Sequence, residues 1–114
     1  MTLYGIRNCD TVKKARRWLE ANGAPYTFHD FRVDGLEPAL LEQWSRAVGW
    51  ETLLNRRGTT WRQLSEGERA DVDEAKALKL MLAHPALIKR PVLEHAGTIH
   101  VGFADAEYQI LFKS

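Results

Sequence analysis

The chain has 114 residues, of which 45% are hydrophobic, and its 16 basic and 15 acidic side chains give a formal net charge of +1. This composition is ordinary for a globular protein, and the length predicts one domain because domains cluster near ~100–150 residues. The balanced charge gives no global reason to expect nucleic-acid binding, and no apolar run approaches the ~20 residues that span a membrane. The N-terminal segment lacks the apolar core of a signal peptide, so we expect a cytoplasmic protein.

Cysteine and histidine usage limits the kinds of site that the chain can build. Cys9 is the single cysteine, which excludes an intramolecular disulfide and a cysteine-based zinc site. The four histidines are scattered, and no pair has the helical spacing of metal ligands. We therefore expect no metal.

The N-terminal part of the chain has the pattern of a strand, a helix and a second strand. The segment 2–6 is short and mostly apolar, and the segment 26–31 is rich in aromatic residues with an alternating pattern, so both predict strands. Between them, after a cap or first-turn residue at Asp10 or Thr11, three apolar residues recur at helical spacing: Val12, Ala15 and Leu19. This order predicts a parallel βαβ unit.

The middle of the chain, residues 36–84, has an almost purely helical pattern. Longer helices are predicted over residues 36–48 and 73–84, with a loop at residues 55–60 between them. We expect four residues to form the inward face of the second helix: Ala75, Leu78, Met81 and Leu82.

The C-terminal part predicts a hairpin and a closing helix. Residues 91–95 and 98–102 flank Ala96-Gly97, a typical hairpin turn, and residues 104–111 follow with a helical pattern. The complete order is β-α-β-(helices)-β-β-α. It predicts an α/β protein with a small mixed sheet of four strands, covered by helices.

Cys9 lies in the expected turn between the first strand and the first helix. A helix N-terminus carries unpaired N–H groups and a partial positive charge, and both favour the nucleophilic thiolate over the thiol. Arg7, two residues earlier, adds positive charge. The alternative, a small buried hydrophobic cysteine, is the commoner fate of a free cysteine and stays open at this point.

Three segments carry a resemblance to a known family. Residues 4–15, Tyr-Gly-Ile-Arg-Asn-Cys-Asp-Thr-Val-Lys-Lys-Ala, resemble the N-terminal signature of the arsenate-reductase-like (ArsC/Spx/YffB) family. Residues 53–62 resemble its arginine-containing loop, and residues 87–92 resemble its I-x-R-P-V/I segment. The combination is most similar to the YffB-type branch. The resemblance implies a thioredoxin-like (glutaredoxin-like) fold, with residues 1–114 forming one domain and a helical insertion at about 36–84.

The resemblance also implies a set of site residues. Cys9 would be the nucleophile, and Arg90 would contact its thiolate or an oxyanion, for which a guanidinium is suited. Pro91 corresponds to the proline that opens the third strand of thioredoxin-like folds, where it is cis and faces the cysteine. The residues expected to bind substrate or glutathione are Pro91, Arg7, Asn8 and Arg57.

Two interpretations of the arginine loop stay open. Arg56, Arg57 and Arg62 surround Gly58, and they would suit an anion such as a glutathione carboxylate. Alternatively, they pair with an acidic stretch that follows: Glu66, Glu68, Asp71, Asp73 and Glu74.

The chain departs from its relatives at several positions. Val12 stands where redox-switch members carry the second cysteine of Cys-x-x-Cys, so a disulfide on Cys9 needs an external thiol. Gly5 stands where plasmid-type arsenate reductases have a histidine. Asn55 and Phe103 fall where those enzymes place two of their three oxyanion-binding arginines, which disfavours arsenate reduction.

The resemblance therefore predicts an oxidoreductase, a glutathione-dependent thiol reductase with a single nucleophilic cysteine. Glutathione would be the co-substrate, and a protein disulfide or an oxyanion would be the substrate. We expect a monomer without nucleic-acid or membrane partners. The alternatives are an arsenate reductase and a non-catalytic, Spx-like transcription regulator that binds RNA polymerase.

Overall fold

The computed structural model describes residues 1–112, which form two compact units. The first unit comprises Met1–Asp30 and the chain from Arg90 onward, and the second comprises Phe31–Lys89. The first unit contains the sheet, and the second is helical. The assignment of one domain with an insertion at about 36–84 stays a prediction.

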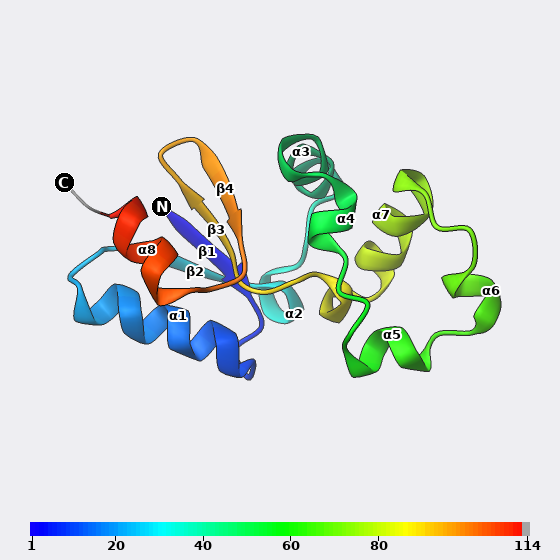
Figure 1. The fold of residues 1–114 in the computed structure, drawn as a ribbon, viewed down its shortest axis with the longest axis horizontal. Helices are drawn as coiled ribbons and strands as arrows, with labels where there is room; N and C mark the ends of the chain where they lie inside the picture. Colours follow the sequence, from blue (N-terminus) through cyan, green and yellow to red (C-terminus); the bar gives the residue numbers. More distant parts are fainter. Residues whose placement is uncertain (113–114) are drawn as a thin grey trace. The chain divides into compact units, whose positions relative to one another are not determined.

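The first unit is built on a mixed sheet of four strands in the order β2-β1-β3-β4 (Figure 1). The strands are β1 (Thr2–Gly5), β2 (Thr27–Asp30), β3 (Val92–His95) and β4 (Thr98–Val101). β1 pairs parallel with β2 and antiparallel with β3, and β3 pairs antiparallel with β4. The predicted α/β class, the parallel βαβ unit and the hairpin are therefore confirmed.

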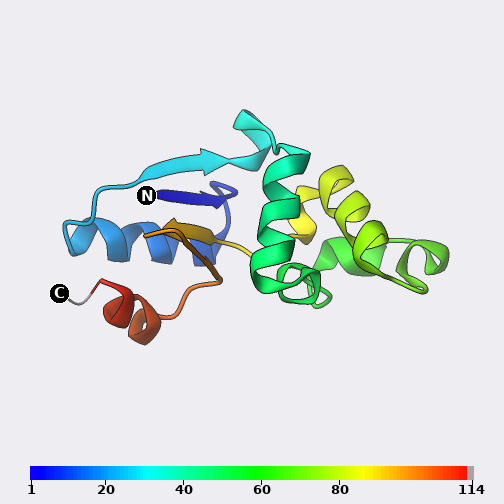
Figure 2. The ribbon, with the colours of Figure 1, turned by 90° about the horizontal axis from the view of Figure 1, so that it is seen from above.

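Helix α1 (Asp10–Ala21) connects the parallel strands, and its inward residues are those predicted from their spacing: Val12, Ala15 and Leu19. The closing helix α8 (Asp105–Leu111) lies alongside α1 in both Figure 1 and Figure 2. The Trp18 ring of α1 meets the Tyr108 ring of α8 edge to face, with the centroids 5.5 Å apart. The two helices therefore cover the same face of the sheet.

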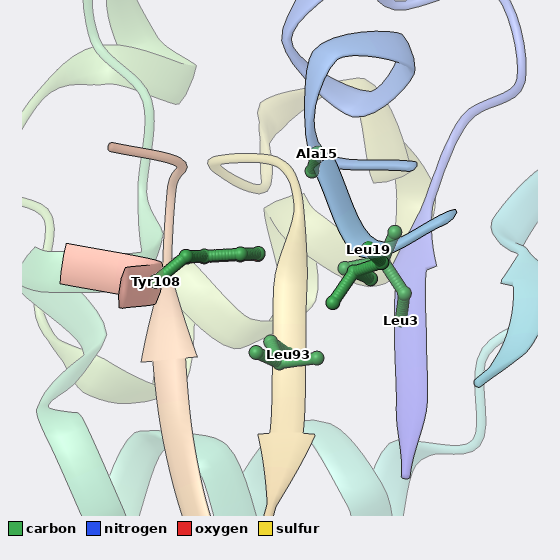
Figure 3. Packing of buried hydrophobic residues seen from close by; sticks show 5 residues of the cluster. All are labelled: Leu3, Ala15, Leu19, Leu93 and Tyr108. Atoms are coloured by element: carbon green, nitrogen blue, oxygen red, sulfur yellow. The ribbon is translucent and has the colours of Figure 1, made fainter. Parts of the chain in front are cut away.

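The core of the first unit lies between this face and the two helices. Leu3 and Leu93 are partners in the β1–β3 register, and both are fully buried. Figure 3 shows these side chains pointing toward Ala15 and Leu19 of α1 and Tyr108 of α8. Burial of these side chains holds α1, and with it the Cys9 turn, against the sheet.

The hairpin turn has the geometry that its two residues predict. Ala96 and Gly97 have φ angles of 51° and 78°. Positive φ at both central residues is typical of a type I′ turn, which matches the twist of the flanking strands.

The second unit consists of short helices. They are α2 (Phe31–Asp34), α3 (Pro38–Val48), α4 (Trp50–Leu53), α5 (Thr59–Gln63), α6 (Glu66–Arg69), α7 (Glu74–Ala83) and the 3-10 helix η1 (Pro85–Leu87). α2 and α6 were not predicted, because four residues are too few to show a helical period. Local capping defines α6, since Ser65 and Glu68 form a reciprocal capping box. Within residues 1–112, no helix is long and apolar enough to cross a membrane.

The predicted inward face of α7 is wrong. Ala75 is exposed, and Leu78 and Leu82 are only half-buried. The buried residues are Ala77, Leu80 and Met81, of which only the last was predicted. The helix is apolar on most of its circumference, so its sequence does not select one face. The elements it packs against, which include α3, α4 and η1, decide which residues are buried.

Gly5, the last residue of β1, allows α1 to approach the strand closely. A Cβ atom on Gly5 would lie 2.7 Å from Cγ2 of Val12, which is itself fully buried. Val12 is β-branched and stiff at χ1, so its methyl group cannot easily rotate away.

We expect Gly5→Ala to lower the free energy of unfolding by about 1–3 kcal/mol, because the added methyl overpacks this contact. Val12→Ala should destabilise the protein by leaving a cavity. The double variant should lose less free energy of unfolding than the sum of the losses in the two single variants. Urea denaturation measures all three. Gly67→Ala is the matched control, because the nearest atom to its added Cβ is Ser65 Oγ at 4.0 Å, and it should be close to neutral. Strict additivity of the two changes would contradict the close contact.

Candidate active site

Cys9 is the N-cap residue of α1. The Cys9 N–H donates to the Ile6 carbonyl at 3.1 Å, and the Cys9 carbonyl accepts the N–H of Lys13 at 3.0 Å. The first bond closes the turn after β1, and the second begins the helix. Asp10, one of the two expected cap or first-turn residues, occupies the first turn. The thiol therefore lies at the start of a 12-residue helix, where backbone donors are unpaired.

The environment of Cys9 lowers the pKa of its thiol. Burial is the largest influence and raises the pKa, but the opposing interactions together exceed it. They are the backbone N–H groups of Val12 and Thr11 and the Arg90 guanidinium, which donates a hydrogen bond and supplies charge. The Cys9 side chain makes no well-formed capping hydrogen bond, so the helix N–H groups act as nearby dipoles rather than as full partners. The half-buried sulfur therefore favours the thiolate.

Arg90 and Pro91 lie immediately before β3, and the peptide bond between them is cis. The cis bond that the family resemblance implied is thus confirmed. Pro91 is buried, and its carbonyl accepts the N–H of Gly102 at 2.8 Å. This bond ties the segment to the residue that follows β4 and fixes the backbone that carries Arg90.

Asp30 is a site residue that the sequence analysis missed. It is the last residue of β2, it is the register partner of Gly5, and only 5% of it is exposed. Its Oδ2 accepts the backbone N–H of Arg7 at 3.1 Å, which holds the turn between β1 and Cys9. The signal was available, because the carboxyl ends of parallel neighbouring strands meet at one edge of a sheet.

The other predicted site residues are placed as follows. Arg7 and Asn8 are exposed and occupy the turn just before Cys9. Arg57 belongs to the second compact unit, in the loop between α4 and α5. The structure thus brings Cys9 and Arg90 together within the first unit, with Pro91 bonded to Arg90 and with Arg7 and Asn8 in the adjoining turn.

Three carboxylates of the acidic stretch have partners other than the loop arginines. Glu68 accepts the N–H of Ser65, Asp73 accepts the N–H of Lys76, and Glu74 accepts the hydroxyl of Ser45. The hydrogen bonds from Ser65 lower the pKa of Glu68. The acidic stretch therefore mainly caps and connects helices.

Metal ligation has no candidate in the described structure. Within residues 1–112, no group of three or more His, Cys, Asp or Glu side chains could hold a metal ion.

The sequence of the chain matches that of a known family. The sequence profile of the ArsC family matches residues 4–111. The chain belongs to the ArsC family. An uncharacterized protein of Haemophilus influenzae is 45% identical over 112 residues, which cover 98% of both chains. The global transcriptional regulator Spx 2 of Lactococcus lactis is 25% identical over 109 residues, covering 94% of this chain and 82% of the regulator.

Solved structures of ArsC-family proteins share the fold. The YffB (PA3664) protein is 51% identical and superposes with a TM-score of 0.93, covering 96% of each chain. An arsenate reductase (ArsC) related protein of Brucella melitensis is 54% identical with a TM-score of 0.79, covering 99% of this chain and 94% of the other. The predicted thioredoxin-like fold and the resemblance to YffB are thus confirmed.

The lowered pKa of Cys9 predicts its reactivity. We expect iodoacetamide to alkylate Cys9 with a kinetic midpoint at lower pH than in the urea-unfolded chain, since alkylation follows the thiolate fraction. Arg90→Gln should raise the midpoint, because it removes a charge and a strong donor, whereas the exposed Arg17→Gln should not. The thiolate should contribute stability above the unfolded-state pKa that is lost as the pH falls through the folded-state pKa. A folded-state midpoint at or above the unfolded value would contradict this prediction.

The bond from Arg7 to Asp30 predicts that Asp30 positions the Cys9 turn. Asp30→Ala should lower the free energy of unfolding by about 1–3 kcal/mol, because the Arg7 N–H loses its acceptor. It should also move the alkylation midpoint of Cys9 upward, since the turn is released. Asp30→Asn keeps a carbonyl oxygen as an acceptor. It should therefore lower the free energy of unfolding less and shift the alkylation midpoint less than Asp30→Ala. If the two variants leave the Cys9 midpoint equal to that of the wild type, Asp30 has no positioning role.

Proposed function

We propose that the chain is a glutathione-dependent thiol reductase whose single nucleophile is Cys9. The observation that carries the proposal is the Cys9 sulfur at the N-terminus of α1, with Arg90 lowering its pKa and Val12 three residues later. A valine at that position leaves Cys9 without a resolving thiol in its own chain, so an external thiol completes the cycle.

The reaction balances with glutathione as the reductant. The Cys9 thiolate attacks one sulfur of a substrate disulfide, forms a mixed disulfide and releases the other half as a thiolate, which takes up a proton. A glutathione thiolate then attacks the mixed disulfide and restores the Cys9 thiolate. A second glutathione completes the reduction, so that the substrate gains two electrons and glutathione is oxidised to its disulfide.

Each predicted site residue has a role in this proposal. Arg90 stabilises the Cys9 thiolate as it is regenerated, because its guanidinium offers both charge and donors. Pro91 shapes the backbone at which the incoming thiol aligns. Arg7 and Asn8 are exposed beside Cys9 and contact the substrate or glutathione, and Arg57 binds an anionic group of the same ligands.

The proposal extends to the setting of the reaction. A thiol kept reduced by glutathione suits the cytoplasm, where we place the protein. We propose that it acts as a monomer on a protein disulfide or an oxyanion, and that residues 1–114 form one domain with a helical insertion at about 36–84.

The first test is turnover of a mixed disulfide between glutathione and 2-mercaptoethanol, coupled to glutathione reductase. Wild type should consume the disulfide, and Cys9→Ser should be inactive because the serine hydroxyl cannot form the intermediate. Arg90→Gln should lower kcat/KM by about tenfold or more, since it raises the pKa of the nucleophile. Arg17→Gln, which changes an exposed charge on α1, serves as the control. Turnover that persists in Cys9→Ser would overturn the proposal.

The same preparation distinguishes the alternatives. Glutathione oxidation that depends on arsenate and not on the disulfide would identify an arsenate reductase, in line with the name of the Brucella relative. Absence of both activities, together with retention of RNA polymerase subunits by the chain, would identify a non-catalytic regulator resembling Spx.

A further inference from the structure

The first two turns of α1, next to Cys9, carry positive charge that has no part in the reaction proposed above. Residues 7–17 contain five basic side chains and one acidic side chain, whereas the formal net charge of the whole chain is +1. Positive charge is therefore concentrated around the nucleophile. Within this segment, Lys13 and Lys14 are exposed and follow Cys9 closely in α1.

Arg16 of the same helix shows how a basic side chain serves the fold. Its guanidinium carbon lies 4.3 Å from the centroid of the Phe28 ring, and its Nε donates to the Tyr26 hydroxyl at 3.0 Å. Arg16 is half-buried by these contacts. In contrast, within residues 1–112 no ion pair joins Lys13 or Lys14 to a carboxylate. The charges of the two lysines therefore remain available to a partner.

The helix itself gains no stability from the positions of these lysines. The helix dipole favours cations in the last turn, where α1 has no basic residue. Lys13 and Lys14 lie four and three residues before Arg17, and like charges at these spacings destabilise a helix. The lysines therefore carry charge that does not contribute to folding.

Lys13 is a direct neighbour of Cys9 in the helix. The Cys9 carbonyl accepts the Lys13 N–H at 3.0 Å, so the two residues are one helical turn apart. Arg17 lies about 12 Å from Cys9 along the axis, beyond the Debye length of ~8 Å at physiological ionic strength. Burial of the sulfur, the N–H groups of α1 and Arg90 set the pKa of the thiol. Lys13 and Lys14 are thus beside the nucleophile without being needed to activate it.

The shape and chemistry of this surface indicate what binds there. The exposed side of a single helix is convex, whereas small-molecule sites are concave. An extended protein segment can follow a convex surface and place several carboxylates along it. The disulfide that a thiolate attacks belongs to proteins and small thiols, and nucleic acids contain none. An acidic protein segment therefore matches both the charge of the surface and the chemistry of Cys9.

We propose that Lys13 and Lys14 dock an acidic segment of a substrate protein and thereby bring a disulfide in that segment to Cys9. The inference rests on the proposed function for the reaction at Cys9, and it adds the charge of the substrate and the residues that recognise it. Carboxylates that flank the disulfide meet the two ammonium groups, and the exchange then proceeds as described above. Opposite charges raise the rate of encounter and select this class of substrate.

The test compares two synthetic peptides of equal length, each with one cysteine joined to glutathione in a mixed disulfide. Glutamates flank the cysteine in one peptide, and glutamines flank it in the other. Turnover by the full chain is coupled to glutathione reductase, and each kcat/KM is divided by the rate of the uncatalysed exchange with glutathione. The glutamate peptide should be preferred about fivefold to tenfold at low ionic strength, and this ratio should approach one at about 1 M salt. Equal values at low ionic strength would overturn the proposal.

Substitutions of the lysines show which charges cause the preference. Lys13→Gln and Lys14→Gln should each lower the ratio about twofold to threefold, and the double variant should bring it close to one. A general loss of activity or of folded protein cancels in the ratio. Arg17→Gln removes the same charge from the same helix farther from Cys9, so it is the matched control and should keep the ratio. A preference that persists in the double variant, or that falls equally in Arg17→Gln, would overturn the proposal.

Nucleic acid is the other class of polyanion that a basic surface binds. Fluorescence anisotropy of labelled duplex DNA and duplex RNA, at the same ionic strength, measures this binding. Binding that the double variant loses, combined with no preference for the glutamate peptide, would identify a nucleic-acid surface and overturn the proposal.

The docking test and the turnover test fail separately. Turnover of the 2-mercaptoethanol disulfide without a preference for the glutamate peptide leaves the reductase and removes this inference. If no disulfide is turned over, the proposed function fails, and titration of Cys9→Ser with both peptides decides the docking alone. Tighter binding of the glutamate peptide, with amide chemical-shift changes at Lys13 and Lys14, would support it, and equal binding would overturn it.

Discussion

The close approach of α1 to the end of β1 is the constraint on which the Cys9 site depends. Gly5 has no side chain to hold the helix away, so Val12 packs onto the strand end, and the helix begins only a few residues later. Cys9 is therefore placed at the N-cap by backbone geometry rather than by a capping side chain of its own. A bulkier residue at Gly5 would displace the start of the helix and with it the N–H groups that act on the sulfur.

The pKa of the Cys9 thiol is set by two opposing influences, burial of the sulfur and the hydrogen-bond donors around it. Burial alone would raise the pKa of the thiol, and the N–H groups of α1 together with Arg90 reverse that effect. Arg90 is far from Cys9 in the sequence but close to it in the fold, because β3 pairs with β1 in the sheet. Asp30 contributes from β2 by holding the N–H of Arg7. Neighbouring strands on both sides of β1 thus support one turn.

The arginines of the second unit illustrate how one residue type serves different purposes. Arg62 supports the loop by donating to the Arg57 carbonyl, and Arg56 packs near two tryptophans. Nearby carboxylates such as Glu68 and Asp73 act in helix capping instead. Arg57 and Lys89 are exposed, and they line a pocket together with Glu51, Leu54 and Arg56.

The sequence by itself determined the elements whose signals are local. Apolar spacing located α1, the turn residues Ala96-Gly97 located the hairpin, and the family resemblance correctly predicted the cis bond before Pro91. Only the tertiary structure decided which face of α7 is buried, because a helix that is apolar nearly all round has no preferred side until its neighbours are packed. The pairing of β2 with β1 likewise brings Asp30 to the Cys9 turn. A bridge between segments more than 30 residues apart forms the surroundings of Arg57. Contacts between such distant segments leave no period or motif in the sequence, so they had to be seen in the fold.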